Sequence, residues 1–174
     1  MPHLQLVSLA KARFLTDWRS APAGSLLQVR ELPETAPLAS PLIVFRFDDT
    51  IAGNGTVNSV LVLEGASAGM IRSARDNQLW PAMDASELVE LCIRNAGPTR
   101  VTVSEPVVGQ LVMLLDDDDR YGACFMAAGY NKELAGYVCL HSRLAEYKHG
   151  SVLAQLDRSK LLRAGSAEIR ELRN

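Results

Sequence analysis

Cysteine is scarce in this 174-residue chain, and its three copies are scattered. Cys92, Cys124 and Cys139 are odd in number, and no two of them form a Cys-x-x-Cys pair. Paired cysteines would indicate a disulfide-stapled secreted domain, and close-spaced Cys or His ligands would indicate a structural zinc site. Their absence argues against both classes. We expect free, buried thiols in a reducing compartment, and therefore a cytoplasmic protein.

An excess of charge of one sign and a long apolar run are also missing. The formal net charge is -2, and the basic residues near the C-terminal end have no aromatic residues among them, so we expect no nucleic-acid binding. No uncharged stretch approaches the roughly 18 residues that a membrane-spanning helix needs. Lys11, Arg13 and Asp17 would interrupt the apolar core of a signal peptide. We therefore expect neither membrane insertion nor export.

Motifs that bind cofactors or metals are absent as well. The sequence has no P-loop, no His-Glu-x-x-His and no EF-hand loop, and Gly53-x-Gly55-x-x-Asn58 lacks the third glycine of the dinucleotide fingerprint. The aspartates Asp116 to Asp119 are consecutive, whereas a hard cation takes carboxylates from alternate loop positions or from separate elements. We interpret them as a solvated turn, and we predict no cofactor and no metal.

The clearest local pattern in the sequence is that of a hairpin. The composition is that of a globular domain, with 48% apolar and 22% charged residues. Leu42 to Ile51 and Val57 to Leu63 are rich in β-branched, leucine and aromatic residues, and the Asn-Gly pair at 54–55 suits a type I′ turn between them. A two-residue turn there predicts that Phe47 and Val62 share one face of the sheet.

Three further apolar runs, Val107 to Leu115, Tyr121 to Ala128 and Leu134 to His141, are separated by turn-forming residues. We predict a meander of strands, although their Ala, Met, Leu and Gly content also suits buried helices. In the meander one face carries Leu111, Met113, Leu115, Tyr121, Ala123, Phe125, Val138 and Leu140.

Helical spacing of apolar residues predicts several helices around these strands. Ala85 to Ala96 is the best marked, because Asp84 and Glu87 form a capping box ahead of it and Gly97-Pro98 follows it. The others are predicted over His3 to Trp18, Ser142 to Lys148 and Ser151 to Arg163. We therefore predict an α+β fold, a single mostly antiparallel sheet covered by helices, as one domain over residues 1–164 with a polar tail over 165–174.

One catalytic motif stands out at Gly65 to Gly69. Its sequence, Gly-Ala-Ser-Ala-Gly, resembles the Gly-x-Ser-x-Gly nucleophile elbow of α/β-hydrolases, and a helix is conceivable over Met70 to Leu79 after it. The resemblance implies that Ser67 is the nucleophile. Asp116, or a neighbouring aspartate, and then His141 or His149 follow in the order of a Ser, Asp, His triad.

Two features depart from that pattern. An elbow strand belongs to a parallel sheet and needs a crossover of about ten or more residues before it, whereas only residues 52–56 separate the two predicted strands. No glycine-rich oxyanion loop follows the upstream strand, where Phe47-Asp48-Asp49 stands instead. A small serine hydrolase is therefore our alternative hypothesis.

The remaining candidate residues are thiols, imidazoles and aromatics. Cys139 and His141 fall on one side of a predicted strand and Cys124 on the same side, as zinc ligands or a Cys-His pair would, but buried cysteines and an edge histidine explain the pattern as well. Trp80, Tyr137, Cys139 and Cys124 are candidate ligand-binding residues. With no complete catalytic set, we expect a non-catalytic binding or accessory domain, homodimeric, which recognises a protein partner or a small ligand through a sheet face or groove.

Overall fold

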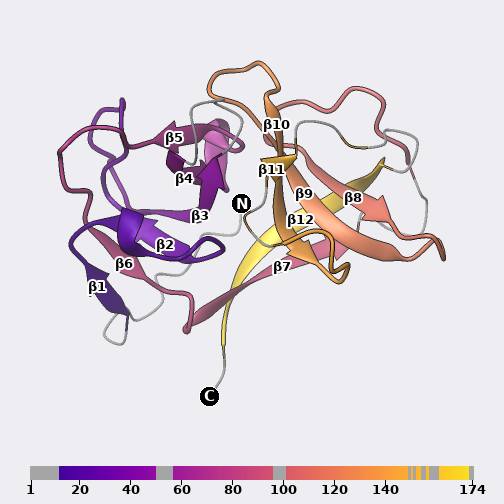
Figure 1. Cartoon of the computed structure of the whole chain (residues 1–174), viewed down its shortest axis with the longest axis horizontal. Coiled ribbons are helices and arrows are strands. Elements are labelled where there is room, and N and C mark those ends of the chain that lie inside the picture. Colours follow the sequence, from indigo (N-terminus) through magenta and orange to yellow (C-terminus); the bar gives the residue numbers. More distant parts are fainter. Residues whose placement is uncertain are drawn as a thin grey trace.

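The computed structural model describes residues 12–49, 57–95, 101–148, 150, 152–153, 156 and 161–172, and strands dominate it. The strands form two six-stranded sheets, which lie side by side in Figure 1. The N-terminal sheet has the order β1-β6-β2-β3-β4-β5, and the C-terminal sheet has the order β11-β10-β9-β8-β12-β7. Neighbouring strands within each sheet are antiparallel.

The elements have the following bounds. The N-terminal sheet contains β1 (Arg13–Leu15), β2 (Leu26–Val29), β3 (Leu42–Asp49), β4 (Val57–Val62), β5 (Ile71–Ser73) and β6 (Ala82–Asp84). The C-terminal sheet contains β7 (Val89–Asn95), β8 (Leu111–Leu115), β9 (Tyr121–Ala128), β10 (Gly136–Ser142), β11 (Val152–Leu153) and β12 (Leu161–Glu171). Two short 3-10 helices, η2 (Trp18–Ser20) and η3 (Gly65–Ser67), complete the described elements. None of the helices among these residues is long and apolar enough to cross a membrane.

The predicted α+β fold with a helix-covered sheet is therefore wrong. The segment 85–96, expected as the best-marked helix, makes a single turn in which the Val89 N–H donates to the Ala85 carbonyl (3.0 Å), and it then continues as β7 up to residue 95, while residue 96 lies outside the described residues. The Asp84 carboxylate of the predicted capping box does accept a hydrogen bond from the backbone N–H of Ser86 (3.0 Å). Asp84 therefore caps this segment, but the segment it caps is a single turn.

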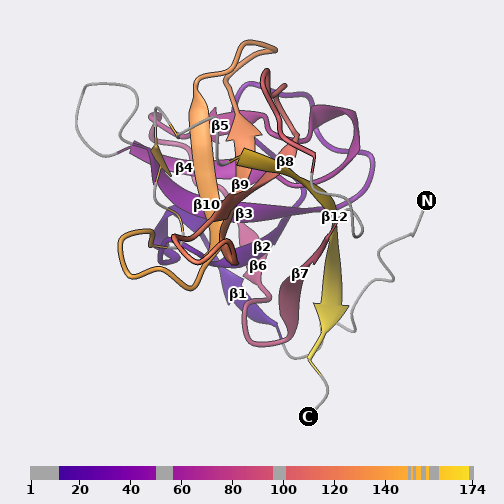
Figure 2. The ribbon, with the colours of Figure 1, turned by 90° about the vertical axis from the view of Figure 1, so that its right-hand side faces the viewer.

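The other predicted helices are likewise strands and loops wherever the chain is described. Residues 70–79 contain β5, residue 142 ends β10 and is followed by turns and bends over 143–147, and residues 151–163 include β11 and the start of β12. The predicted helix at 3–18 lies partly outside the described residues, and its last part contains β1. Residues 165–171 of the expected polar tail belong to β12, which runs beside β7 toward the C-terminus (Figure 2).

The predicted hairpin pairing is confirmed for β3 and β4, but its register is not. A two-residue turn at 54–55 would place Phe47 opposite Val62, whereas Phe47 lies opposite Ser59 and Val62 lies opposite Val44. The turn itself falls outside the described residues. Because side chains alternate along a strand, the offset moves Val62 to the face opposite Phe47.

The predicted meander is also confirmed as strands β8, β9 and β10, with one inversion. Leu115 lies opposite Tyr121, which agrees with their predicted common face, but Leu114 lies opposite Ala123, so Gly122 is an extra residue in β9. This bulge turns Ala123 and the residues after it to the other face. A Cβ atom at position 122 would lie 2.7 Å from Leu144 Cδ1, so glycine fits the bulge best.

Buried apolar side chains fill both faces of each sheet. One cluster draws on both sheets, with Phe45, Phe47 and Leu61 from one and Met126 and Val138 from the other among its members. A second cluster lies on the opposite face of the N-terminal sheet, and a third on the opposite face of the C-terminal sheet. Residues outside the strands complete both of these outer clusters.

The backbones of the two sheets meet at three glycines, Gly69, Gly109 and Gly129, which we call the glycine junction. The Gly129 N–H donates to the Gly69 carbonyl (3.0 Å), and the Ile71 N–H donates to the Gly129 carbonyl (2.9 Å). Gly69 and Gly109 have φ values of 82° and 92°, and a Cβ atom on Gly69 would lie 2.2 Å from the Gly109 nitrogen. Only glycine combines this backbone conformation with so close an approach.

Candidate functional site

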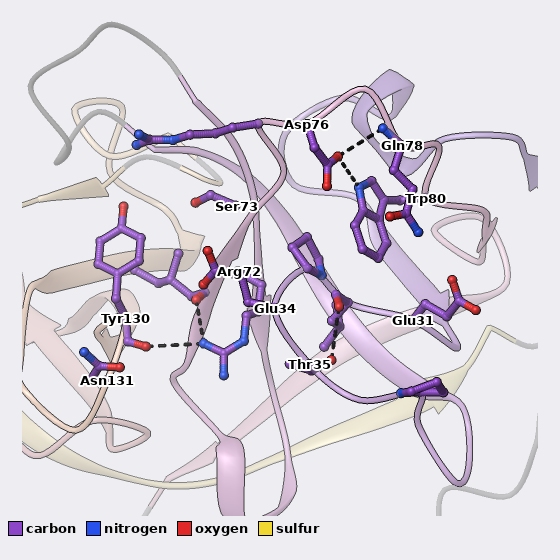
Figure 3. Close-up of a pocket in the computed structure, with 15 residues that line it drawn as sticks. Glu31, Glu34, Thr35, Arg72, Ser73, Asp76, Gln78, Trp80, Tyr130 and Asn131 are labelled. Carbon is purple, nitrogen blue, oxygen red and sulfur yellow. Dashed lines mark hydrogen bonds between the residues drawn. The ribbon is translucent and has the colours of Figure 1, made fainter.

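A hollow of about 800 Å³ opens beside β5, and we call it the β5 hollow (Figure 3). Its walls come from the loop after β2, from β5 and the loop that follows it, and from the residues after β9. The lining residues are Glu31, Leu32, Pro33, Glu34, Thr35, Pro37, Ile71, Arg72, Ser73, Arg75, Asp76, Gln78, Trp80, Tyr130 and Asn131. Most are polar or charged.

β5 is an edge strand of the N-terminal sheet, and part of its edge is open toward this hollow. The Ile71 N–H points away from β4, because it donates to Gly129. Backbone groups alternate in direction along an antiparallel strand, so Ser73 directs its N–H and C=O the same way. The Ser73 side chain points elsewhere, since its hydroxyl lies 2.7 Å from the hydroxyl of Ser59 on β4. Ser73 thus offers an unshielded main-chain donor and acceptor beside the hollow.

Arg72 and Tyr130 hold one wall in place. The Arg72 guanidinium donates to the backbone carbonyls of Ile71 (3.1 Å) and Tyr130 (3.3 Å), and the second of these bonds joins the two sheets (Figure 3). Its Nε is buried and has no hydrogen-bond partner among the described residues. The Tyr130 hydroxyl donates to the fully buried carboxylate of Asp49. The Arg72 guanidinium therefore stabilises this wall of the β5 hollow and still has an unused hydrogen-bond donor, its Nε.

Arg19 stabilises the loop after β5, which forms another wall of the β5 hollow, although Arg19 itself does not line the hollow. Its guanidinium donates to the backbone carbonyls of Asp76 (2.9 Å) and Gln78 (2.6 Å) and pairs with the Asp17 carboxylate (2.6 Å). Within the loop, the Asp76 carboxylate accepts from the Trp80 indole N–H (3.1 Å) and from the Gln78 N–H (3.2 Å). Partial burial acts to raise the pKa of Asp17, but hydrogen bonds from the side chain and backbone of Arg19 outweigh it and hold that pKa below its usual value.

Unpaired charges of both signs stand around the β5 hollow. Glu31, Glu34 and Arg75 are exposed, and none of them forms a side-chain hydrogen bond or ion pair with another described residue. Glu34 also has a φ of 61°, which costs free energy in a residue other than glycine and recurs where a loop serves function. Trp80, which the sequence analysis proposed as a ligand residue, lines this hollow but is 6% exposed, so it forms wall rather than a stacking surface.

Ser67 occupies a different position from that of a nucleophile-elbow serine. It is exposed in η3, between the antiparallel strands β4 and β5, and no described helix follows it. The second glycine of its motif, Gly69, belongs to the glycine junction. The structure thus explains that glycine by backbone crowding.

The proposed triad partners of Ser67 lie elsewhere in the fold. The Asp116 carboxylate accepts from the backbone N–H groups of Asp118 (2.9 Å) and Arg120 (2.8 Å), and so stabilises the turn between β8 and β9. His141 is exposed at the end of β10, and His149 lies outside the described residues. Ser67 lines neither the β5 hollow nor the separate hollow that His141 lines.

The thiol candidates are divided between two faces of the C-terminal sheet. Cys124 faces the shared core, while Cys139 and Tyr137 are buried in the cluster on the outer face. Leu140 is an extra residue in β10, so His141 lies directly opposite Cys124. Burial raises the pKa of Cys124 to about 12, which keeps the thiol protonated at neutral pH. Among the described residues, no three His, Cys, Asp or Glu side chains group as metal ligands would.

The residues around the β5 hollow come from segments up to 100 positions apart, from Glu31 to Asn131. Apart from Trp80, these residues were not predicted from the sequence, because an isolated Arg, Glu or Asn carries no local pattern that marks it as a ligand group. Comparisons of the chain with protein-family models, with curated proteins and with solved structures find no match. The geometry of the chain itself is therefore the basis for inferring its function.

Proposed function

We propose that this protein is a non-catalytic binding domain that holds an extended segment of a partner protein in the β5 hollow. The observation that carries the proposal is the open edge at Ser73, set beside unpaired charges of both signs. Peptides commonly bind by adding a strand to an open sheet edge, where main-chain hydrogen bonds provide affinity and neighbouring side chains provide specificity.

The charges around the hollow define the kind of segment that fits. Glu31 and Glu34 stand on the loop after β2, while Arg72 and Arg75 stand on and after β5. A segment with basic residues toward the loop and acidic residues toward β5 would complement both sides. Such charge complementarity sets the register of the segment and speeds its association.

Ser73→Pro, with Ser73→Ala as its matched control, tests the proposal. Both variants lose the hydroxyl contact with Ser59, but only proline removes the outward N–H while leaving the bonds between β5 and β4 in place. Heptapeptides from a randomised phage library, selected on the wild-type protein, should bind Ser73→Ala nearly as well. They should bind Ser73→Pro about tenfold more weakly or not at all.

Two results would overturn the proposal: equal binding of the selected peptides to Ser73→Pro, or no enrichment of any peptide over an unrelated protein. Circular dichroism of both variants checks that the fold is intact. In a Glu31→Lys, Glu34→Lys double variant, selection should shift from basic toward acidic residues at the positions that face the loop.

We also propose that the protein is a cytoplasmic homodimer. β7 lies at an edge of the C-terminal sheet, is seven residues long, and carries the half-buried apolar residues Leu91 and Ile93. Long edge strands of this kind invite pairing, and two copies related by a two-fold axis would pair β7 with itself. Light scattering should give twice the 19.0 kDa mass of one chain, and a mass of one chain would contradict the dimer.

The scattered free cysteines support the proposed cytoplasmic location, because free thiols are typical of a reducing compartment.

A further inference from the structure

A second hollow, of about 600 Å³, opens between β7 and the strands β8, β9 and β10, and we call it the β7–β9 hollow. It is lined by Leu91, Ile93, Met113, Asp119, Arg120, Tyr121, Gly122, Ala123, Cys124, His141 and Arg143. It shares no lining residue with the β5 hollow. Its chemistry also differs, because its floor is apolar.

The floor belongs to the edge of the shared core. Met113 of β8 lies directly opposite Cys124 of β9, and Leu91 and Ile93 of β7 pack against the same core cluster. Met113, Leu91 and Ile93 are each only half-buried, so their apolar surface faces the hollow. An apolar floor with a few polar groups at the mouth is the usual constitution of a small-molecule site.

The mouth of the β7–β9 hollow is cationic. Arg120 ends the turn before β9, and Arg143 follows β10, with its backbone N–H bonded to the Gly122 carbonyl (2.8 Å). Both residues are exposed, and neither guanidinium takes part in a hydrogen bond or ion pair with another described residue. Among the described residues that line this hollow, Asp119 is the one acid. Two guanidinium groups and one carboxylate therefore line this hollow.

We propose that the β7–β9 hollow binds a small amphiphilic anion. The apolar tail of the ligand would lie on Leu91, Ile93 and Met113, and its carboxylate or phosphate head would be bound by Arg120 and Arg143. Guanidinium groups suit both head groups because they form paired, charge-assisted hydrogen bonds with either. A neutral molecule would leave the two cations unused, and a cation would be repelled by them. This proposal is independent of peptide binding at β5.

Calorimetric titration of the full chain with octanoate, octyl phosphate, 1-octanol, octylamine and acetate tests the proposal. Octanoate or octyl phosphate should bind, and the stronger of the two identifies the head group. Octanol, octylamine and acetate should bind at least about tenfold more weakly, because each lacks either the anionic head or the apolar tail. Binding of octanol as tight as that of both anions, or no binding of either anion, would overturn the proposal.

Substitutions locate the site. Arg120→Gln and Arg143→Gln should each weaken binding of the preferred anion about tenfold, because each removes a charge-assisted contact. The matched control is Arg163→Gln, an exposed arginine on β12 that lines neither hollow, and it should leave the affinity unchanged. Ile93→Ser should weaken the binding of octanoate or octyl phosphate, because it removes apolar contact with the tail, and it should leave the weak binding of acetate unchanged. An equal loss in all three arginine variants would mean that only net charge matters, which would also overturn the proposal.

Discussion

The two glycines of the Gly-x-Ser-x-Gly motif are explained by the backbone conformation that each adopts, without a catalytic role. Gly65 and Gly69 have φ values of 78° and 82°, so the backbone at either position would be strained if it carried any other residue. Their surroundings differ, however. A Cβ atom at Gly65 meets nothing within 4 Å, whereas at Gly69 it would collide with the backbone of Gly109 and of Ala127.

This difference predicts unequal costs for the same substitution at the two positions. Gly65→Ala should lower the free energy of unfolding by about 1 kcal/mol, the cost of the left-handed conformation. Gly69→Ala should lower it by about 3 kcal/mol or more, because the glycine junction must also open. Urea denaturation measures both values. Equal losses at the two positions would show that the junction contributes nothing beyond backbone strain.

At Asp17 the expected effect depends on pH. The pKa of this carboxyl is lowered in the folded protein by its hydrogen bonds with Arg19. A carboxyl whose pKa is lower in the folded state stabilises the fold at pH values above its unfolded pKa, and the contribution is lost as the pH falls through the folded pKa. The stabilisation from this pair is therefore present at neutral pH and disappears in acid.

We predict that Asp17→Asn lowers the free energy of unfolding at pH 7 and that the difference from the wild-type protein shrinks below about pH 4. Urea denaturation across this pH range checks it. The same substitution made in an Arg19→Gln background should show no such pH dependence, because the partner that lowers the pKa is gone. A difference that stays constant into acid would contradict the role given to Arg19.

At the scale of elements, the sequence predicted strands well and helices badly. β3 and β4 were predicted because β-branched and aromatic residues mark them, and β8 to β10 because turn-forming residues separate their apolar runs. The prediction of a helix at 85–96 was wrong because the chain makes a single turn after Asp84 and then continues as β7. Every residue of β9 after Tyr121 is buried. A strand buried on both faces loses the alternation that distinguishes it from a helix.

Strand register explains why the predicted faces of β9 and β10 were wrong in part. The extra residue at Gly122 turned Ala123 to the other face, and the extra residue at Leu140 placed His141 opposite Cys124. Bulges have no reliable sequence pattern, so a face predicted by strict alternation inverts wherever one occurs. The charged residues of both hollows were unpredictable for another reason, since loops distant in sequence bring them together.

Across the whole molecule, the shared core and the glycine junction predict a single cooperative unfolding transition. The chain contains convenient separate probes for this test. Both tryptophans, Trp18 and Trp80, are buried on the outer face of the N-terminal sheet, and the buried thiols of Cys124 and Cys139 belong to the C-terminal sheet. Tryptophan fluorescence and thiol labelling should therefore give the same urea midpoint. Two separate midpoints would show that the sheets unfold independently.

The length of β5 also bears on solubility. An open strand edge is a template on which further chains can stack, and long, flat, apolar edges lead to fibrils. β5 has only three residues, and charged Arg72 and Arg75 stand on it and just after it. So short an edge provides too few main-chain hydrogen bonds to seed the growth of an aggregate, while it suffices to align one segment beside charged neighbours. Because this strand is so short, the protein can leave the edge of β5 uncovered without aggregating through it.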